Sequence, residues 1–170
     1  MSRRVYVHAA VGGVTPAQGA IGPPLARLLA IAYRQLVDGL HTELVARGWT
    51  DVRPAFGFVL LAARDEATSV TALSTLMGTT KQAASKLVDA MEQSGYVRRV
   101  PGQEDGRQRP VEITARGRKL LQAVEQIYSE LERAWAQQIG DAELERMRGD
   151  LVRLLTDPDD GRLPPVRPTW

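Results

Sequence analysis

Residues 69–99 read SVTALSTLMGTTKQAASKLVDAMEQSGYVRR and contain two helical patterns separated by a glycine. Ser69 is a suitable N-cap for a short first helix, which Gly78 interrupts. Thr79-Thr80 then open an amphipathic helix, and Gly95 suits the left-handed position that commonly follows a helix. A short helix, a tight turn and an amphipathic helix together predict a helix-turn-helix.

The next segment predicts a β-hairpin with a projecting tip. Tyr96–Val100 and Val111–Ile113 are strand-like, and the polar, turn-forming residues 101–110 separate them. A linker of this length is too long for a tight hairpin turn. A hairpin that directly follows a helix-turn-helix predicts a winged helix-turn-helix domain.

On the N-terminal side, residues 1–24 are rich in Gly, Ala and Pro without a sustained period, which predicts a flexible arm. Apolar residues at helical spacing over 25–44 predict a long amphipathic helix. A second helix should start at Arg53 or Pro54, since proline is tolerated in a first turn, and end near Arg64.

On the C-terminal side, two more helices are expected. Thr114 can cap a long helix that ends at Gly140, and Asp141 can cap a last helix. A proline-rich tail should occupy 157–170. The predicted fold class is therefore mainly α (α+β): a winged helix-turn-helix domain over 25–156 with N- and C-terminal dimerisation helices.

Composition narrows the classes of function. The chain has no Cys and only two His, far apart at His8 and His41, so neither a disulfide framework nor a metal site is expected. No nucleophile, base and orienting group form a recognisable set, so we expect neither an enzyme nor a cofactor. No apolar run is long enough to span a bilayer or to form a signal-peptide core, which predicts a cytoplasmic protein without a membrane partner.

Positive charge is concentrated around the predicted winged domain. Between Gly78 and Lys119 there are nine Lys or Arg and five Asp or Glu, a net +4, whereas the whole chain carries +2. Such a concentration is the electrostatic footprint of a surface that faces phosphate groups. Double-stranded DNA is therefore the expected partner.

The second helix of the pair has polar side chains on the face opposite its apolar stripe. Gln82 could pair with adenine, Lys86 could reach guanine, and Ser85 could bind a base or a phosphate, with Lys81 beside them. Thr79-Thr80 lie where free N–H groups favour a phosphate. The alternative is that these residues are simply the solvated face of a surface helix.

The hairpin favours the DNA interpretation. Arg107 and Arg109 are predicted at its tip, where the negative potential of a minor groove attracts guanidinium groups. Asp105 could pair with Arg107 and orient it. These three residues complete the predicted DNA-binding set.

Dimerisation is predicted from the apolar stripes of the first and last two helices. They contain more large apolar residues than a small winged domain needs, and a two-fold interface would bury them. Two recognition helices would then lie about 34 Å apart on a palindromic site. The competing interpretation is that residues such as Trp135 and Leu151 fill a core within one chain.

The ordered set KQAASKLVD (81–89), SGYVRR (94–99), DGR (105–107) and VEITARG (111–117) resembles the MarR family of multiple-antibiotic-resistance regulators. The resemblance covers roughly Leu25 to Leu155. It implies a homodimer with interlocked terminal helices and one winged domain per half-site.

The resemblance also implies contacts by particular residues. It places DNA contacts on Gln82, Ser85 and Lys86 and a minor-groove contact on Arg107. This chain departs from the family where Gly106 stands in place of the first of two adjacent arginines.

The family resemblance further implies a small aromatic or anionic effector bound between the dimerisation helices and the winged domain. Five residues near the junction of the first two helices could line such a pocket: Tyr33, His41, Trp49, Arg53 and Phe56. The alternative places Tyr33 and Phe56 in the core and His41 on the polar surface.

Two functions remain as hypotheses. The first is a ligand-responsive transcriptional repressor that binds a palindromic operator as a homodimer. The second is a winged helix used for protein interaction without specific DNA binding, because fold alone does not determine function.

Overall fold

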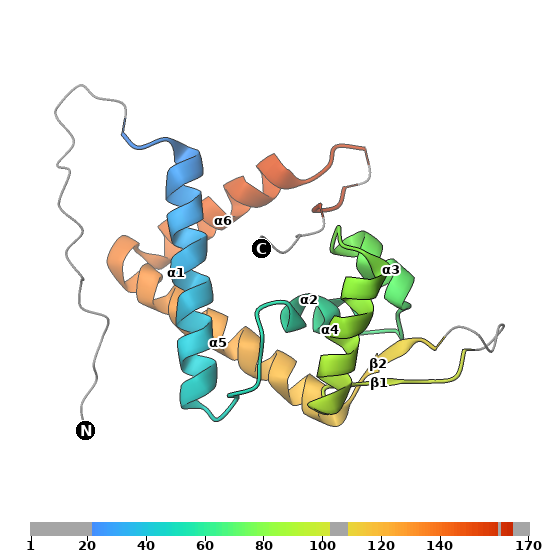
Figure 1. Cartoon of the computed structure of the whole chain (residues 1–170). Coiled ribbons are helices and arrows are strands. Elements are labelled where there is room, and N and C mark those ends of the chain that lie inside the picture. Colours follow the sequence, from blue (N-terminus) through green and yellow to red (C-terminus); the bar gives the residue numbers. More distant parts are fainter. Residues whose placement is uncertain (1–21, 103–108, 160, 165–170) are drawn as a thin grey trace. The chain divides into compact units, whose positions relative to one another are not determined.

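The structure, a computed structural model, describes residues 22–102, 109–159 and 161–164. Its elements are α1 (Leu25–Ala46), α2 (Phe56–Ala62), α3 (Val70–Leu76), α4 (Lys81–Gln93), β1 (Val97–Arg99), β2 (Val111–Ile113), α5 (Ala115–Ile139) and α6 (Asp141–Leu155) (Figure 1). This order confirms the predicted mainly α, winged helix-turn-helix architecture. Most of the predicted arm, Asp105 and Arg107 at the predicted hairpin tip, and the end of the predicted tail lie outside the described residues.

The chain divides into two compact units, and the boundary between Arg34 and Gln35 falls inside α1. In the first unit, the described residues are the start of α1 and the residues just before it. Large side chains of this part of α1 are exposed: Leu25, Leu28, Leu29, Ile31 and Tyr33. The second unit contains the rest of α1 and all other elements.

The helix-turn-helix consists of α3 and α4, and both helices are capped: Ser69 as predicted, and Thr80 at the helix start where a phosphate contact was expected. The Ser69 hydroxyl accepts a hydrogen bond from the Ala72 N–H at 3.0 Å, and the Thr80 hydroxyl accepts one from the Ala83 N–H at 3.1 Å. Gly95 follows α4 with a φ of 74°, a conformation that favours glycine. These local signals set where the two helices begin and where the second one ends.

The wing is an antiparallel pair in which Val97 faces Ile113 and Arg99 faces Val111. The Val100 N–H extends the pairing by donating to the Pro110 carbonyl at 2.8 Å. Thr68, just before α3, adds an isolated bridge to Val111 through two backbone hydrogen bonds of 2.7 and 2.9 Å. The base of the wing is therefore attached to the start of the helix-turn-helix.

Two helix starts differ from the sequence prediction. Pro54 lies in a turn, and α2 begins at Phe56, whose N–H donates to the Arg53 carbonyl at 2.9 Å. Asp141 does not cap α6: Gly140, with a φ of 96°, takes the cap position, and Asp141 is the first helical residue. A carboxylate in the first turn still stabilises the helix through its dipole.

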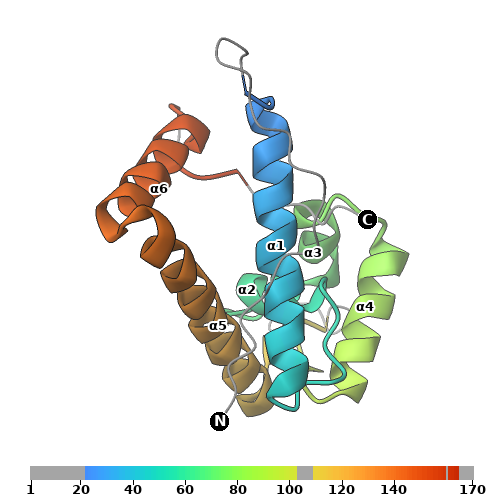
Figure 2. The same cartoon turned by 90° about the vertical axis from the view of Figure 1, so that its left-hand side faces the viewer.

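The core of the second unit is apolar and draws on α1, α2, α3, α4, the hairpin and α5. Figure 2 shows α5 as a long helix within this unit, and α6 follows the end of α5 in a different direction. A Cβ atom at Gly39 in α1 would lie 3.0 Å from Leu131 of α5, so these helices approach closely there. The most buried large side chains include Leu44, Phe56, Leu60, Leu73, Val88, Met91, Tyr96, Ile113, Leu120 and Ile127.

Across the described ranges, none of the helices has an apolar stretch that could cross a lipid bilayer.

Gly117, in the first turn of α5, lies against the backbone of the α4–β1 connection. A Cβ atom there would be 2.1 Å from the Tyr96 carbonyl oxygen and 2.7 Å from the Ile113 side chain. We predict that Gly117→Ala lowers the free energy of unfolding by at least about 2 kcal/mol, because backbone must move. Urea denaturation measures this loss.

The matched control is Gly149→Ala in α6, where nothing lies within 4 Å of the added Cβ. That variant should be stabilised by about 0.5–1 kcal/mol through helix propensity alone. Equal effects of the two substitutions would contradict the close approach at Gly117.

Candidate nucleic-acid interface

The polar face predicted for the recognition helix is exposed on α4. Lys81, Gln82 and Lys86 are exposed and Ser85 is half-buried. On the opposite side, Ala84, Val88 and Met91 are buried. The helix therefore presents cationic and hydrogen-bonding side chains outward from a fixed apolar base.

The start of α4 is organised by the two threonines. Thr80 is exposed and its hydroxyl caps the helix, while Thr79 is half-buried. The Thr79 N–H donates to the Ser74 carbonyl at 3.0 Å, which links the turn to α3. The first turn of α4 still has backbone N–H groups without partners inside the helix, as the N-terminus of any helix does.

The base of the wing adds exposed arginines. Arg109 is exposed just before β2. Arg98 on β1 pairs across the hairpin with Glu112 at 2.8 Å, and its side chain is 65% exposed. With α4, these side chains place positive charge on both parts of the winged domain that can face a polyanion.

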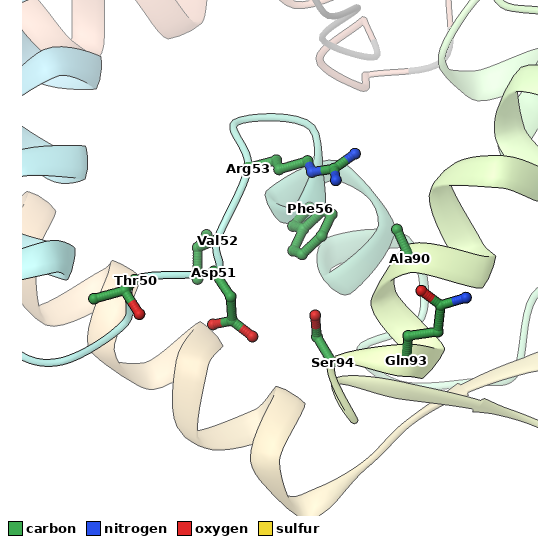
Figure 3. Close-up of a pocket in the computed structure, with 8 residues that line it drawn as sticks. All are labelled: Thr50, Asp51, Val52, Arg53, Phe56, Ala90, Gln93 and Ser94. Carbon is green, nitrogen blue, oxygen red and sulfur yellow. The ribbon is translucent and has the colours of Figure 1, made fainter.

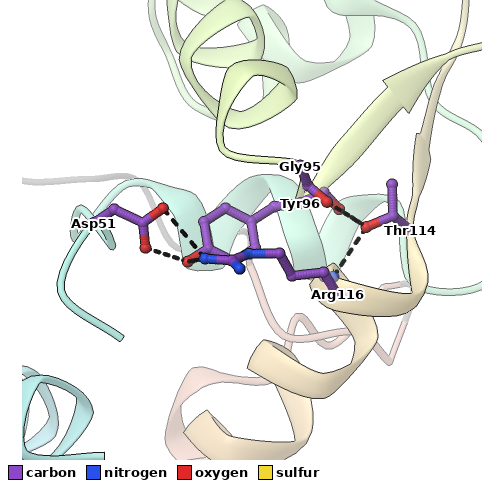
Figure 4. A network of polar contacts seen from close by, with 6 residues as sticks. Asp51, Gly95, Tyr96, Thr114 and Arg116 are labelled. Carbon is purple, nitrogen blue, oxygen red and sulfur yellow. Dashed lines mark hydrogen bonds and ion pairs between the residues drawn. The ribbon is translucent and has the colours of Figure 1, made fainter. Parts of the chain in front are cut away.

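A polar network that sequence reasoning missed joins the α1–α2 connection to the wing and α5 (Figure 4). Tyr96 is fully buried, and its hydroxyl donates to the Asp51 carboxylate at 2.5 Å. Arg116 donates to the Tyr96 hydroxyl at 3.3 Å, and its guanidinium lies over the rings of Tyr96 and Trp49 at 4.9 and 5.7 Å. No short-range motif signals these contacts, because Asp51 and Tyr96 are 45 residues apart.

The network shifts the titration of both partners. The hydrogen bond from Tyr96 is the main cause that lowers the pKa of Asp51, and Arg116 adds to the effect. Burial is the main cause that raises the pKa of Tyr96, followed by its bond to Asp51. Asp51 is therefore ionised, and Tyr96 is a neutral donor, near neutral pH.

Thr114 links the α4–β1 connection to the first turn of α5. Its hydroxyl lies 2.6 Å from the Gly95 carbonyl and 3.0 Å from the Tyr96 carbonyl, and it accepts the Gly117 N–H at 3.1 Å. As predicted, Thr114 is the N-cap of α5. It also holds the start of α5 against the end of α4.

Only two of the five predicted effector residues share a cavity. Arg53 and Phe56 line a cavity of about 310 Å³ at the α1–α2 connection (Figure 3). Phe56 is also almost fully buried, as the core interpretation expected. The other lining residues are Thr50, Asp51, Val52, Ala90, Gln93 and Ser94, the last three from the end of α4.

The remaining three effector candidates do not line this cavity. Trp49 packs against Tyr96, with ring centroids 6.1 Å apart. His41 is half-buried in α1, and burial lowers its pKa. Tyr33 belongs to the first unit and is 48% exposed, which contradicts its assignment to the core.

In the part of the chain that the structure describes, no three His, Asp or Glu side chains are grouped so that they could hold a metal ion.

The fold and the exposed face of α4 define a winged helix-turn-helix domain. Residues 58–108 match the sequence model of the MarR family, from α2 into the wing. Over this segment, the resemblance to the MarR family that the motifs predicted is confirmed. No curated protein sequence matches the chain.

Several solved protein structures share the fold, among them a transcriptional regulator, BldR. Apo wild-type MarR from E. coli has a TM-score of 0.65 at 21% identity, over 78% of this chain and 98% of that one. BldR from Sulfolobus solfataricus has a TM-score of 0.56 at 26% identity, over 76% and 93%. An S. aureus MepR mutant bound to an oligodeoxyribonucleotide has a TM-score of 0.56 at 20% identity, over 77% and 95%.

The Tyr96–Asp51 bond predicts a specific pH dependence. Because it lowers the pKa of Asp51 in the folded state, its stabilisation is present above the ordinary value of 3.8 and is lost as pH falls through the lower folded value. We predict that Tyr96→Phe costs about 1 kcal/mol at pH 7 and that this difference shrinks as pH falls below 3.8, through the lowered pKa of Asp51.

Urea denaturation at a series of pH values measures this difference. Tyr33→Phe, which removes a hydroxyl from an exposed ring in the first unit, is the control and should change stability little at any pH. A cost of Tyr96→Phe that stays constant from pH 7 to pH 2.5 would contradict the assignment.

Proposed function

We propose that this chain is a sequence-specific DNA-binding transcriptional regulator that acts as a homodimer on a palindromic operator, as a ligand-responsive repressor. The observation that carries the proposal is the exposed face of α4, where Lys81, Gln82 and Lys86 project from a helix whose other face is buried. A major groove is about 12 Å wide and admits such a helix. Arg109, exposed at the base of the wing, is assigned a second, cationic contact.

The similarity to a MepR mutant solved with a bound oligodeoxyribonucleotide supports DNA as the partner. A winged helix that binds only proteins would not need lysines and a glutamine on the exposed face of its second helix. We assign base contacts to Gln82, Ser85 and Lys86. Thr79, Thr80 and Lys81 are assigned phosphate contacts, and Asp105, Arg107 and Arg109 belong to the wing.

Homodimer formation is supported by the apolar side chains that the terminal helices leave exposed. In α6 and just after it, Met147, Val152, Leu154, Leu155 and Leu163 are between 40% and 73% exposed. In the first unit, the start of α1 is similarly apolar and exposed. Trp135 and Leu151 are only half-buried, so the chain's own core does not cover them completely.

We further propose that the cavity at the α1–α2 connection is the effector site. Arg53 is an exposed cation at this cavity and can hold an anionic group, while Phe56 and Val52 supply apolar contacts. Ala90, Gln93 and Ser94 come from the end of the recognition helix. A ligand bound there would touch the helix that reads DNA.

DNA recognition is tested by selecting bound sequences from random duplexes and then measuring binding by mobility shift. Gln82→Ala should reduce discrimination at one base position by about 1–3 kcal/mol, because its bidentate contact is lost. Lys86→Ala should also weaken binding, and Arg107→Ala should weaken it across sequences and lower the salt slope by about 1.

The control for lost charge is Arg133→Ala, at an exposed position of α5. It should leave the base preference unchanged. A chain that fails to shift any duplex at low salt, or selected sequences without two-fold symmetry, would reject the corresponding part of the proposal.

The effector proposal predicts that a benzoate or phenol-type anion raises the melting temperature and weakens DNA binding. Arg53→Ala should abolish both effects, because the cation at the cavity is lost. His41→Ala removes another candidate that does not line the cavity, and it should keep both effects. An unchanged DNA affinity across a panel of such anions would argue against ligand response.

A further inference from the structure

Arg99 connects the wing to the recognition helix through three hydrogen bonds. Its guanidinium donates to the Asp89 carboxylate at 2.6 Å and to the Glu92 carboxylate at 2.5 Å. Its backbone N–H donates to the other oxygen of Glu92 at 3.0 Å. One residue of β1 is thereby fastened to the second half of α4.

In this brace, formed by Arg99, Asp89 and Glu92, the arginine is the sheltered member. The Arg99 side chain is 17% exposed, whereas Asp89 and Glu92 are 50% and 40% exposed. A planar guanidinium that bonds two carboxylates restricts orientation more than a single ion pair does.

Because Arg99 lies at the base of the hairpin, the brace holds the base of the wing against α4. Arg99 pairs with Val111, and the Val100 N–H continues the ladder to Pro110. Arg109 comes directly before Pro110. The brace therefore acts at the point from which the wing projects, close to a cation assigned to DNA.

The two carboxylates of the brace are unfavourable for the stability of α4 itself. Asp89 and Glu92 lie in the last two turns of α4, where negative charge opposes the helix dipole. They would also repel DNA phosphates. The backbone hydrogen bond from Arg99 is the main cause that lowers the pKa of Glu92, and the charge of Arg109 contributes to the shift.

We propose that Arg99 is a positioning residue for DNA recognition: it holds the wing at a fixed angle to α4, so that both reach their grooves at the same time. This inference rests on the proposed function. Two contacts held rigidly share a high effective concentration, whereas a loosened wing must find its groove separately. Asp89 contributes to this positioning through its hydrogen bond with Arg99.

An alternative account assigns Arg99 only the neutralisation of acidic charge, and the two accounts differ in sign. If charge alone matters, Glu92→Ala removes a negative charge and should tighten DNA binding. If the brace matters, Glu92→Ala removes the two carboxylate oxygens that accept hydrogen bonds from Arg99. The contribution of the wing to DNA affinity should then become weaker. Glu92→Ala therefore separates the two.

The experiment is a double-mutant cycle with Arg109→Ala, measured by mobility shift with a selected duplex. In the otherwise unchanged chain, we expect Arg109→Ala to weaken binding about fivefold or more. In Arg99→Gln and in Glu92→Ala, the same change should weaken binding less than about twofold, because the wing is no longer held.

Arg98→Gln is the matched control. It removes the same charge from the adjacent residue of β1, whose ion pair with Glu112 stays within the hairpin. In this background, Arg109→Ala should keep its full effect. Should Arg99→Gln not fold, Arg99→Lys and Glu92→Ala carry the test, with Lys expected to recover only part of the coupling.

The outcomes separate the inference from the proposed function. Absence of any duplex binding by the unchanged chain overturns both. DNA binding with an undiminished effect of Arg109→Ala in the Arg99→Gln and Glu92→Ala backgrounds overturns the brace alone. Tighter binding by Glu92→Ala also overturns it and supports the charge account.

Discussion

The winged domain depends on one contact, the packing of the first turn of α5 against the backbone at Gly95 and Tyr96; we call this contact the seat of α5. Thr114 lies within hydrogen-bond distance of both carbonyls and caps α5, and the absence of a side chain at Gly117 lets that turn approach them. Because Tyr96 ends the α4 connection and precedes β1, a single seat aligns the recognition helix, the wing and the long α5 helix. From the other side, the Tyr96 hydroxyl reaches Asp51 and ties in the α1–α2 connection.

This seat separates two kinds of surface on α4. Near its N-terminus, Lys81, Gln82 and Lys86 are exposed, which suits contacts that must adapt to bases. Near the C-terminal end, Asp89 and Glu92 are already engaged by Arg99, and Ser94 lies at a cavity. One half of the helix is available for a partner, whereas the other half is bound to the rest of its own domain.

Local patterns predicted the elements well, because caps and periodicity act within a few residues. Ser69, Thr80 and Thr114 each mark a helix start by a side-chain bond three residues ahead. The prediction that Asp141 caps α6 was wrong, because Gly140 adopts a positive φ and takes the cap position itself. The Asp51–Tyr96 contact could not be predicted, because nothing in either segment shows which distant partner it meets. Four of the predicted α4 contacts lie on one exposed or half-buried face, whereas the effector candidates were only partly brought together.

The close approach of Gly39 to Leu131 has an evolutionary consequence. The space that a side chain at 39 would need is occupied by a leucine tip, 3.0 Å from the position of a Cβ atom. Among homologous chains, a larger residue at the first position should therefore accompany a smaller one at the second, so that their combined volume stays nearly constant. Such paired variation would be visible in related sequences as correlated substitution between α1 and α5, although the two positions are far apart along the chain.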